Sequence, residues 1–268
     1  MRKTLLMLVL CAFLAAGCMT LEGEPFNINI LSTPQEIELG NELSTEIEKQ
    51  EKVSTDAELQ AYVSEIGARV ASVATRQDVT YNFTVIDNPD TVNAFALPGG
   101  HMYVYTGLMK ICENEAELAS VMAHEVAHVA AHHHGEALTK QYGYSLLTQL
   151  LLGEDPSTLA KIASGVFGQG VLSYYSRENE READALGMEF LYRAGYQPAA
   201  MVSFMEKLMA EEQRAGGGNP LPIFASHPPT QERHVRLQTL LQRYPLAEQQ
   251  DSPLYVERYN QKALARLK

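Results

Sequence analysis

The chain has 268 residues, of which 46% are hydrophobic and 20% charged, values that are ordinary for a folded globular protein with a sizeable core. Its formal net charge is −12 at pH 7, and no basic cluster offsets this excess of acids. Such a surface repels nucleic-acid phosphates, so we expect no nucleic acid among its partners. After the first residues, no stretch approaches the roughly 18 apolar residues that a membrane-spanning helix needs.

The beginning of the chain is typical of a cleavable export signal. Arg2 and Lys3 form a positive region, and an apolar stretch follows over residues 5–14. This stretch is too short for a stable membrane span, and small residues come directly after it. The pattern therefore predicts a signal peptide.

Residues 14–18 read Leu-Ala-Ala-Gly-Cys and resemble the bacterial lipobox, in which the cysteine is lipidated and becomes the mature N-terminus. We expect a lipoprotein signal peptide over residues 1–17, lipidation of Cys18, and a lipid-anchored tether over residues 18–33. Met19 rather than aspartate follows the cysteine, which by resemblance to Gram-negative sorting indicates the outer membrane. An ordinary signal peptide, or a core segment with a chance cysteine, is the alternative. The predicted location is the periplasmic side of the envelope, with membrane contact through the lipid.

The remainder, residues 34–268, is predicted to form one domain. Helical spacing of apolar residues predicts helices over residues 35–51 and 56–74, the second capped by Asp56. Alternating and β-rich stretches then predict three short strands, which form a small sheet. The strands are expected at residues 79–86, 93–97 and 103–105. The later helices are expected at residues 115–134, 136–151, 157–171, 179–194, 198–214, 230–243 and 253–266.

The segment His124–His128 reads His-Glu-Val-Ala-His within an apolar helical stretch. Residues four apart lie one turn apart on the same side of a helix, so His124 and His128 can direct two imidazoles at one zinc ion. Glu125 is rotated by about 100°, so its carboxylate can reach a metal-bound water and act as general base. A helix that carries two buried core histidines is the alternative.

A catalytic zinc needs a third protein ligand, and the dense acidic segment downstream is residues 176–184. Helical geometry places Glu180 and Asp184 on the inward face, whereas Glu178 and Glu182 point toward solvent. Two inward acids need partners, because an unpaired buried charge is costly. We expect Glu180 to bind the zinc and Asp184 to support a liganding histidine. A solvated, charged helix face is the alternative.

These two segments resemble the M48 family of zinc peptidases, and in particular its periplasmic lipoprotein (BepA/LoiP-like) branch. Residues 93–100 (NAFALPGG) and residues 226–228 (SHP) extend the resemblance over most of the chain. It implies an α+β fold, a mainly helical zincin of the gluzincin type with a small three-stranded sheet. It also implies one Zn²⁺ per chain and a set of site residues: His124, His128 and Glu180 as metal ligands and Glu125 as catalytic base.

Two further segments gain a role from the resemblance. Gly100, His101, Met102 and Tyr103 are similar to the family's strand beside the cleft, which would pair with an extended substrate backbone and give weak sequence specificity. An internal strand after a glycine turn is the alternative. His227 is expected either to occupy the fourth zinc position in a latent form or to stabilise the oxyanion as a catalytic residue, against the alternative of a surface histidine.

Three histidines directly follow the metal motif, His132, His133 and His134. They fan across different helix faces, so we expect most of them to be solvated. For His133, a position often occupied by histidine in this family, the resemblance allows at most a supporting role near the metal.

The sequence thus predicts a zinc metalloendopeptidase that hydrolyses peptide bonds in misfolded or unassembled envelope proteins. The quality-control role depends on the resemblance and the location, and not on the metal motif. An outer-membrane assembly chaperone or scaffold with a mostly latent zinc site is the alternative. A purely structural zinc protein fits less well, because three ligands leave one position open and Glu125 is correctly placed.

Overall fold

A computed structural model describes residues 29, 31–140, 175–214, 221–228, 230–245 and 253–267. The predicted signal peptide, Cys18 and most of the tether lie outside the described residues. The same holds for the helix predicted at 157–171 and for most of the one predicted at 136–151. Within the described part, no helix combines the length and the apolar character needed to cross a membrane.

The first two helices begin at the capping residues that the sequence contains. α2 (Thr33–Gln50) follows Ser32, whose backbone N–H donates to Gln35 Oε1 at 2.9 Å. α3 (Ala57–Ala71) follows Asp56, whose carboxylate accepts from two backbone N–H groups of the first turn at 3.0 Å each. Both predicted helices are confirmed, with α3 ending three residues earlier than predicted.

The three predicted strands form one mixed sheet, in which β3 (His101–Tyr105) lies between the other two. β1 (Asn82–Ile86) runs parallel to it and β2 (Ala94–Ala96) antiparallel. β1 starts later than the predicted residue 79. The first pair between β1 and β3 is Asn82 with His101. The residues that precede His101 form the turn η2 (Pro98–Gly100), so residues 79–81 have no strand to pair with.

The central place of β3 corrects the prediction for Gly100, His101, Met102 and Tyr103. Met102 pairs with a residue of β1 on one side and with a residue of β2 on the other. The backbone groups of these residues are therefore used within the sheet, and no substrate strand can add there. Gly99 and Gly100 have φ of 76° and 106°, so they form the glycine turn that the alternative interpretation described.

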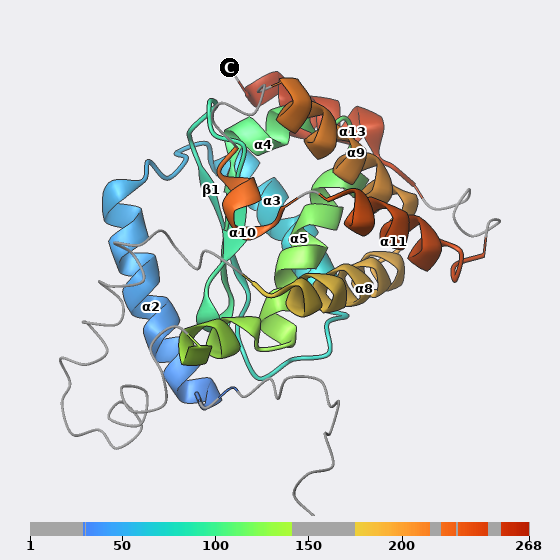
Figure 1. Ribbon diagram of the computed structural model, residues 1–268. Coiled ribbons are helices and arrows are strands. Elements are labelled where there is room, and N and C mark those ends of the chain that lie inside the picture. Colours follow the sequence, from blue (N-terminus) through green and yellow to red (C-terminus); the bar gives the residue numbers. More distant parts are fainter. Residues whose placement is uncertain are drawn as a thin grey trace, which may run out of the picture.

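Helices cover both faces of the sheet. α2 lies on one side of the strands, and α3 and α5 lie on the other (Figure 1). The other elements are α4 (Thr106–Ile111), α5 (Glu115–Ala130), α8 (Arg177–Arg193), α9 (Ala199–Arg214), α10 (Ile223–Ser226), α11 (Gln231–Leu241), α13 (Val256–Lys262) and η3 (Leu264–Arg266).

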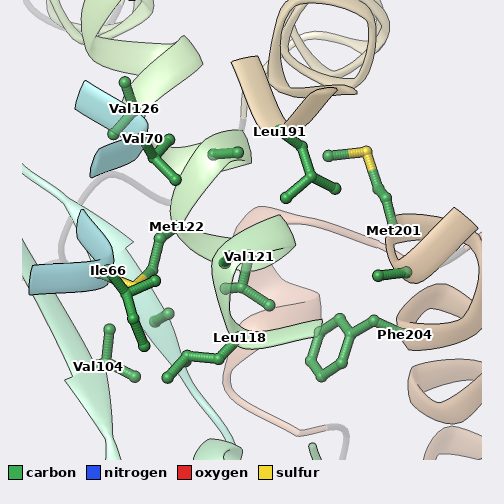
Figure 2. Packing of buried hydrophobic residues seen from close by; sticks show 14 of the residues in the cluster. Ile66, Val70, Val104, Leu118, Val121, Met122, Val126, Leu191, Met201 and Phe204 are labelled. Carbon is green, nitrogen blue, oxygen red and sulfur yellow. The ribbon is translucent and has the colours of Figure 1, made fainter. Parts of the chain in front are cut away.

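α5 is the central helix of the molecule, and its residues 115–129 are all buried. Figure 2 shows its apolar side chains between α3 and the sheet on one side and α8 and α9 on the other. Met122 faces Ile66, Leu118 points toward Val104, and Val121 points toward Phe204. This surrounding shell explains why the helix carries almost no exposed polar residue. The metal motif lies in its second half.

α5 ends at Ala130, four residues before the predicted end. His132 has φ of 59°, the left-handed region that interrupts a helix, and residues 133–140 are helical again.

Candidate metal centre

Four potential metal ligands from separate segments meet at the inner side of α5. α5 contributes His124 and His128, α8 contributes Glu180, and the turn after α10 contributes His227. One ligand atom from each lies within 4.8 Å of all the others, and all four residues are buried. The structure therefore brings together the three predicted ligands and His227, the residue predicted at the fourth position of a latent form, and the burial of His227 excludes the alternative of a surface histidine.

The spacing of these atoms suits one metal ion. Ligand atoms about 2.0–2.1 Å from a tetrahedral zinc lie roughly 3.3–3.4 Å from one another. His124 Nε2 lies 3.1 Å from His128 Nε2 and 3.2 Å from His227 Nδ1. Glu180 Oε1 lies 3.3 Å from His128 Nε2 and 2.9 Å from His227 Nδ1. Three imidazoles and one carboxylate at these distances fit the group that the motif implies.

α8 reaches the centre because a glycine lets it approach α5 closely. Glu180, Asp184 and Gly187 follow one another at helical spacing on the face toward α5. A Cβ atom on Gly187 would lie 3.1 Å from the backbone N and Cα of His124, closer than packed side chains normally come. A larger residue there would displace the helix that carries Glu180.

Asp184 supports His124, in the place that the sequence predicted. His124 Nδ1 lies 3.1 Å from Asp184 Oδ1, while its Nε2 faces the cluster. Arg233 of α11 holds the carboxylate from the other side, with Nη2 and Nε at 2.7 and 3.0 Å. Burial alone would raise the pKa of Asp184, but Arg233 and His124 outweigh it and hold that pKa below its ordinary value.

Glu125 lies at the edge of the cluster and not within it. Its Oε2 accepts the backbone N–H of Ala96 in β2 at 3.1 Å, and its Oε1 lies 3.4 Å from His227 Nε2. Burial raises the pKa of this carboxyl above its ordinary value, although His227 and His124 oppose the rise. A buried carboxyl with a raised pKa next to a metal cluster is suited to accept and return a proton.

The expectation that most of the three following histidines are solvated is wrong. His133 and His134 are 0% and 1% exposed, and only His132 is partly open to solvent. The break at His132 turns the chain back toward the site, which an uninterrupted helix would not do. His134 Nε2 lies 3.0 Å from the carbonyl oxygen of Ala96, and His133 contacts His128.

Arg233 is the site residue that sequence reasoning missed. Besides Asp184, its Nη1 contacts Glu180 Oε2 at 2.7 Å. A signal was present, because Arg233 shares the inward face of α11 with Leu237 and Leu240 at helical spacing. An arginine on the apolar face of a helix is buried, and a buried cation needs an acidic partner.

A small apolar pocket opens beside Glu125 and His227. Its volume is about 40 Å³, and the apolar side chains that line it come mostly from α9: Val121, Met201, Phe204, Met205, Leu208 and Ile223.

The fold and the centre together define the class of the protein. A helix that presents two histidines, a glutamate on a second helix, and a glutamate beside the cluster are the features of an α+β zincin, and that predicted fold class is confirmed. Within this class, the sequence profile of Peptidase family M48 matches residues 57–241, more than half of the chain. The chain belongs to peptidase family M48, and we class it as a metallopeptidase.

Curated relatives have names of the same kind. The chain is 32% identical over 213 residues, 76% of its length, to the beta-barrel assembly-enhancing protease of Escherichia coli (strain K12), of which the match covers 43%. A putative beta-barrel assembly-enhancing protease of Vibrio cholerae is 30% identical over 88% of the chain and 52% of the relative. The mitochondrial metalloendopeptidase OMA1 of Schizosaccharomyces pombe is 31% identical over 67% of the chain and 52% of that relative. The chain thus spans about half the length of these relatives.

Proposed function

We propose that the chain is a zinc-dependent metalloendopeptidase that hydrolyses peptide bonds in misfolded or unassembled envelope proteins. The observation that carries this proposal is the position of Glu125, a buried carboxylate directly beside a cluster of four potential metal ligands. A structural metal site would not need this carboxylate.

Each residue of the centre then has a chemical task. His124, His128 and Glu180 would hold one Zn²⁺, which when bound would polarise the scissile carbonyl and lower the pKa of water. Glu125 takes the proton from the attacking water and passes it to the leaving amine. Asp184, held by Arg233, keeps His124 in the orientation that presents Nε2 to the centre.

His227 gives the centre a latent form in this proposal. It is 4% exposed, and its Nδ1 lies as close to Glu180 and His124 as the other potential ligands lie to each other. A zinc held by all four residues would have no open position for a substrate carbonyl, so we expect the turn after α10 to move before catalysis. Alternatively, His227 stabilises the oxyanion once that turn has moved.

The same closed geometry supports a second candidate function. An outer-membrane assembly chaperone or scaffold would keep its zinc site mostly latent, with His227 as the permanent fourth ligand. This candidate differs from the first because His227 stays in place and no turnover by Glu125 is needed.

The location and the substrates complete the proposal. The lipobox-like segment ending at Cys18 supports a lipid anchor on the periplasmic side. Met19 rather than aspartate after the cysteine favours the outer membrane, by resemblance to Gram-negative sorting. Relatives named for beta-barrel assembly support that process as the setting, and together with the predicted anchor this favours envelope proteins as substrates.

The test is cleavage of casein by the purified full chain, with metal content measured in parallel for the wild type, Glu125→Gln and His227→Ala. We expect zinc in all three and a loss of about 10²-fold or more in Glu125→Gln, because a positioned general base contributes about that much. Greater activity in His227→Ala would establish the latent form, and lower activity would favour the oxyanion role. Zinc without cleavage by the wild type and His227→Ala would favour the scaffold.

A further inference from the structure

His128 is held from two sides. Its Nε2 faces the metal cluster, 3.3 Å from Glu180 Oε1. Its Nδ1 lies 3.0 Å from Nδ1 of His133, and Nε2 of His133 lies 3.4 Å from Glu182 Oε2. His133 is fully buried, whereas the side chain of Glu182 is 53% exposed. The three side chains form a chain of contacts from the centre to the surface of α8.

The chemistry of imidazole assigns a direction to these contacts. A neutral histidine that binds a metal through Nε2 carries its proton on Nδ1, so His128 has to donate from that atom. The atom of His133 that contacts it is Nδ1, which therefore has to accept. The proton of His133 is then on Nε2, the atom that faces the Glu182 carboxylate. Glu182 thus fixes the tautomer of His133, and His133 fixes the tautomer of His128.

We propose that His133 is a positioning residue of the metal centre, fixing the tautomer and the ring orientation of His128, and that Glu182 in turn fixes His133. The proposal rests on His128 being a metal ligand, as in the function proposed above. His124 has a carboxylate in the corresponding place, Asp184 at 3.1 Å. The two histidines of the motif are thus supported by different partners, an anion for His124 and a neutral imidazole for His128.

The backbone shows that this contact is built and not incidental. Residues five apart in a continuous helix lie about 140° apart around the axis, so His133 could not meet His128 if α5 simply continued. The left-handed conformation of His132, with φ of 59°, turns the chain so that it does. Such a conformation is unfavourable for a residue other than glycine.

The test is the affinity of the full chain for zinc, measured by competition with a chelating dye, for the wild type, His133→Leu and His133→Asn. Leucine fills the buried space but cannot accept a hydrogen bond. The side-chain oxygen of asparagine can take the place of Nδ1 and accept from His128. We expect His133→Leu to lower the affinity by about 10–100-fold, the usual effect of losing such a support, and His133→Asn to recover most of it.

His132→Asn is the matched control, because asparagine tolerates a positive φ and His132 contacts Glu36 and not the centre. Its zinc affinity should stay within about threefold of the wild type. Because Glu182 is exposed, Glu182→Leu should leave the core folded. We expect it to lower the zinc affinity severalfold, and we expect Glu182→Gln to keep the wild-type affinity. Thermal unfolding of the metal-free proteins separates misfolding from weakened binding.

Wild-type affinity in both His133→Leu and Glu182→Leu would overturn the proposal, and so would equal losses in His133→Leu and His133→Asn. If the wild type itself bound no zinc, the proposed function would fail instead. If it bound zinc and casein cleavage alone were absent, the role of His133 would still be measurable.

Discussion

A single arginine contacts two of the acids at the centre. Arg233 is 8% exposed and contacts Asp184 through two nitrogens and Glu180 through a third. Burial opposes the charge of the guanidinium, but the two carboxylates raise the pKa of Arg233 above its ordinary value. His227 and Arg233 together hold the pKa of Glu180 below its ordinary value, and Arg233 and His124 do the same for Asp184, so both acids remain ionised inside the protein.

Replacing Arg233 should destabilise the metal-free protein. Arg233→Met leaves two carboxylates buried without their cation, and we expect a loss of about 3–5 kcal/mol in the free energy of unfolding. Arg233→Lys keeps the charge but cannot make the paired contact with Asp184, so the loss should be smaller. Urea unfolding in the presence of a chelator measures both. A loss below about 1 kcal/mol in Arg233→Met would show that the acids do not depend on this residue.

Among the elements, α9 determines the space beside the centre. Its Met201, Phe204 and Met205 line the pocket next to Glu125 and His227. The volume of about 40 Å³ is far below the ~150 Å³ of a cavity that holds benzene. A substrate side chain entering this pocket would have to be small and apolar.

Phe204→Ala should change the substrate preference of the peptidase. We expect the wild type to cleave peptides with alanine or valine next to the scissile bond and to reject phenylalanine there. The wider pocket of Phe204→Ala should raise the relative kcat/KM for phenylalanine by about tenfold or more, the size of effect that pocket volume produces. Glu206→Ala, on the exposed side of α9, is the control. Unchanged ratios in Phe204→Ala would mean that substrates do not use the pocket.

In the whole molecule, the core extends beyond the part matched by the family. That match covers residues 57–241, whereas α13 follows it in the chain and packs against α3 and α5. Tyr259 of α13 is fully buried and donates its hydroxyl proton to the carbonyl oxygen of Met109 at 2.6 Å. Arg258 reaches Glu115, the first residue of α5, which Tyr62 and Tyr196 also contact.

Tyr259→Ala should therefore act as a core mutation. We expect it to lower the free energy of unfolding by about 3–5 kcal/mol, as other large aromatic deletions do. Tyr259→Phe loses one hydrogen bond and should cost about 1 kcal/mol. Denaturant unfolding at 25 °C compares the two with the wild type. If α13 unfolds separately from the domain, Tyr259→Ala will instead differ from the wild type by less than about 0.5 kcal/mol.

The sequence by itself determined the features that depend on local periodicity. Helical spacing placed His124, His128 and Glu125 on α5 and Glu180 and Asp184 on one face of α8, and the structure has them there. Helical spacing of apolar residues located most of the described helices, and β-rich stretches located all three strands. These features follow from contacts within a few residues along the chain, which a single sequence contains.

Only the tertiary structure decided which distant segments meet. The order of the strands puts β3 in the centre, so the predicted substrate strand is internal. The turn at His132 brings His133 to His128, and α11 brings Arg233 to Asp184 across 49 residues of sequence. His227 enters the cluster from the turn after α10, which lies outside the predicted helices. Such pairings are set by packing around the shared core, and no local pattern encodes them.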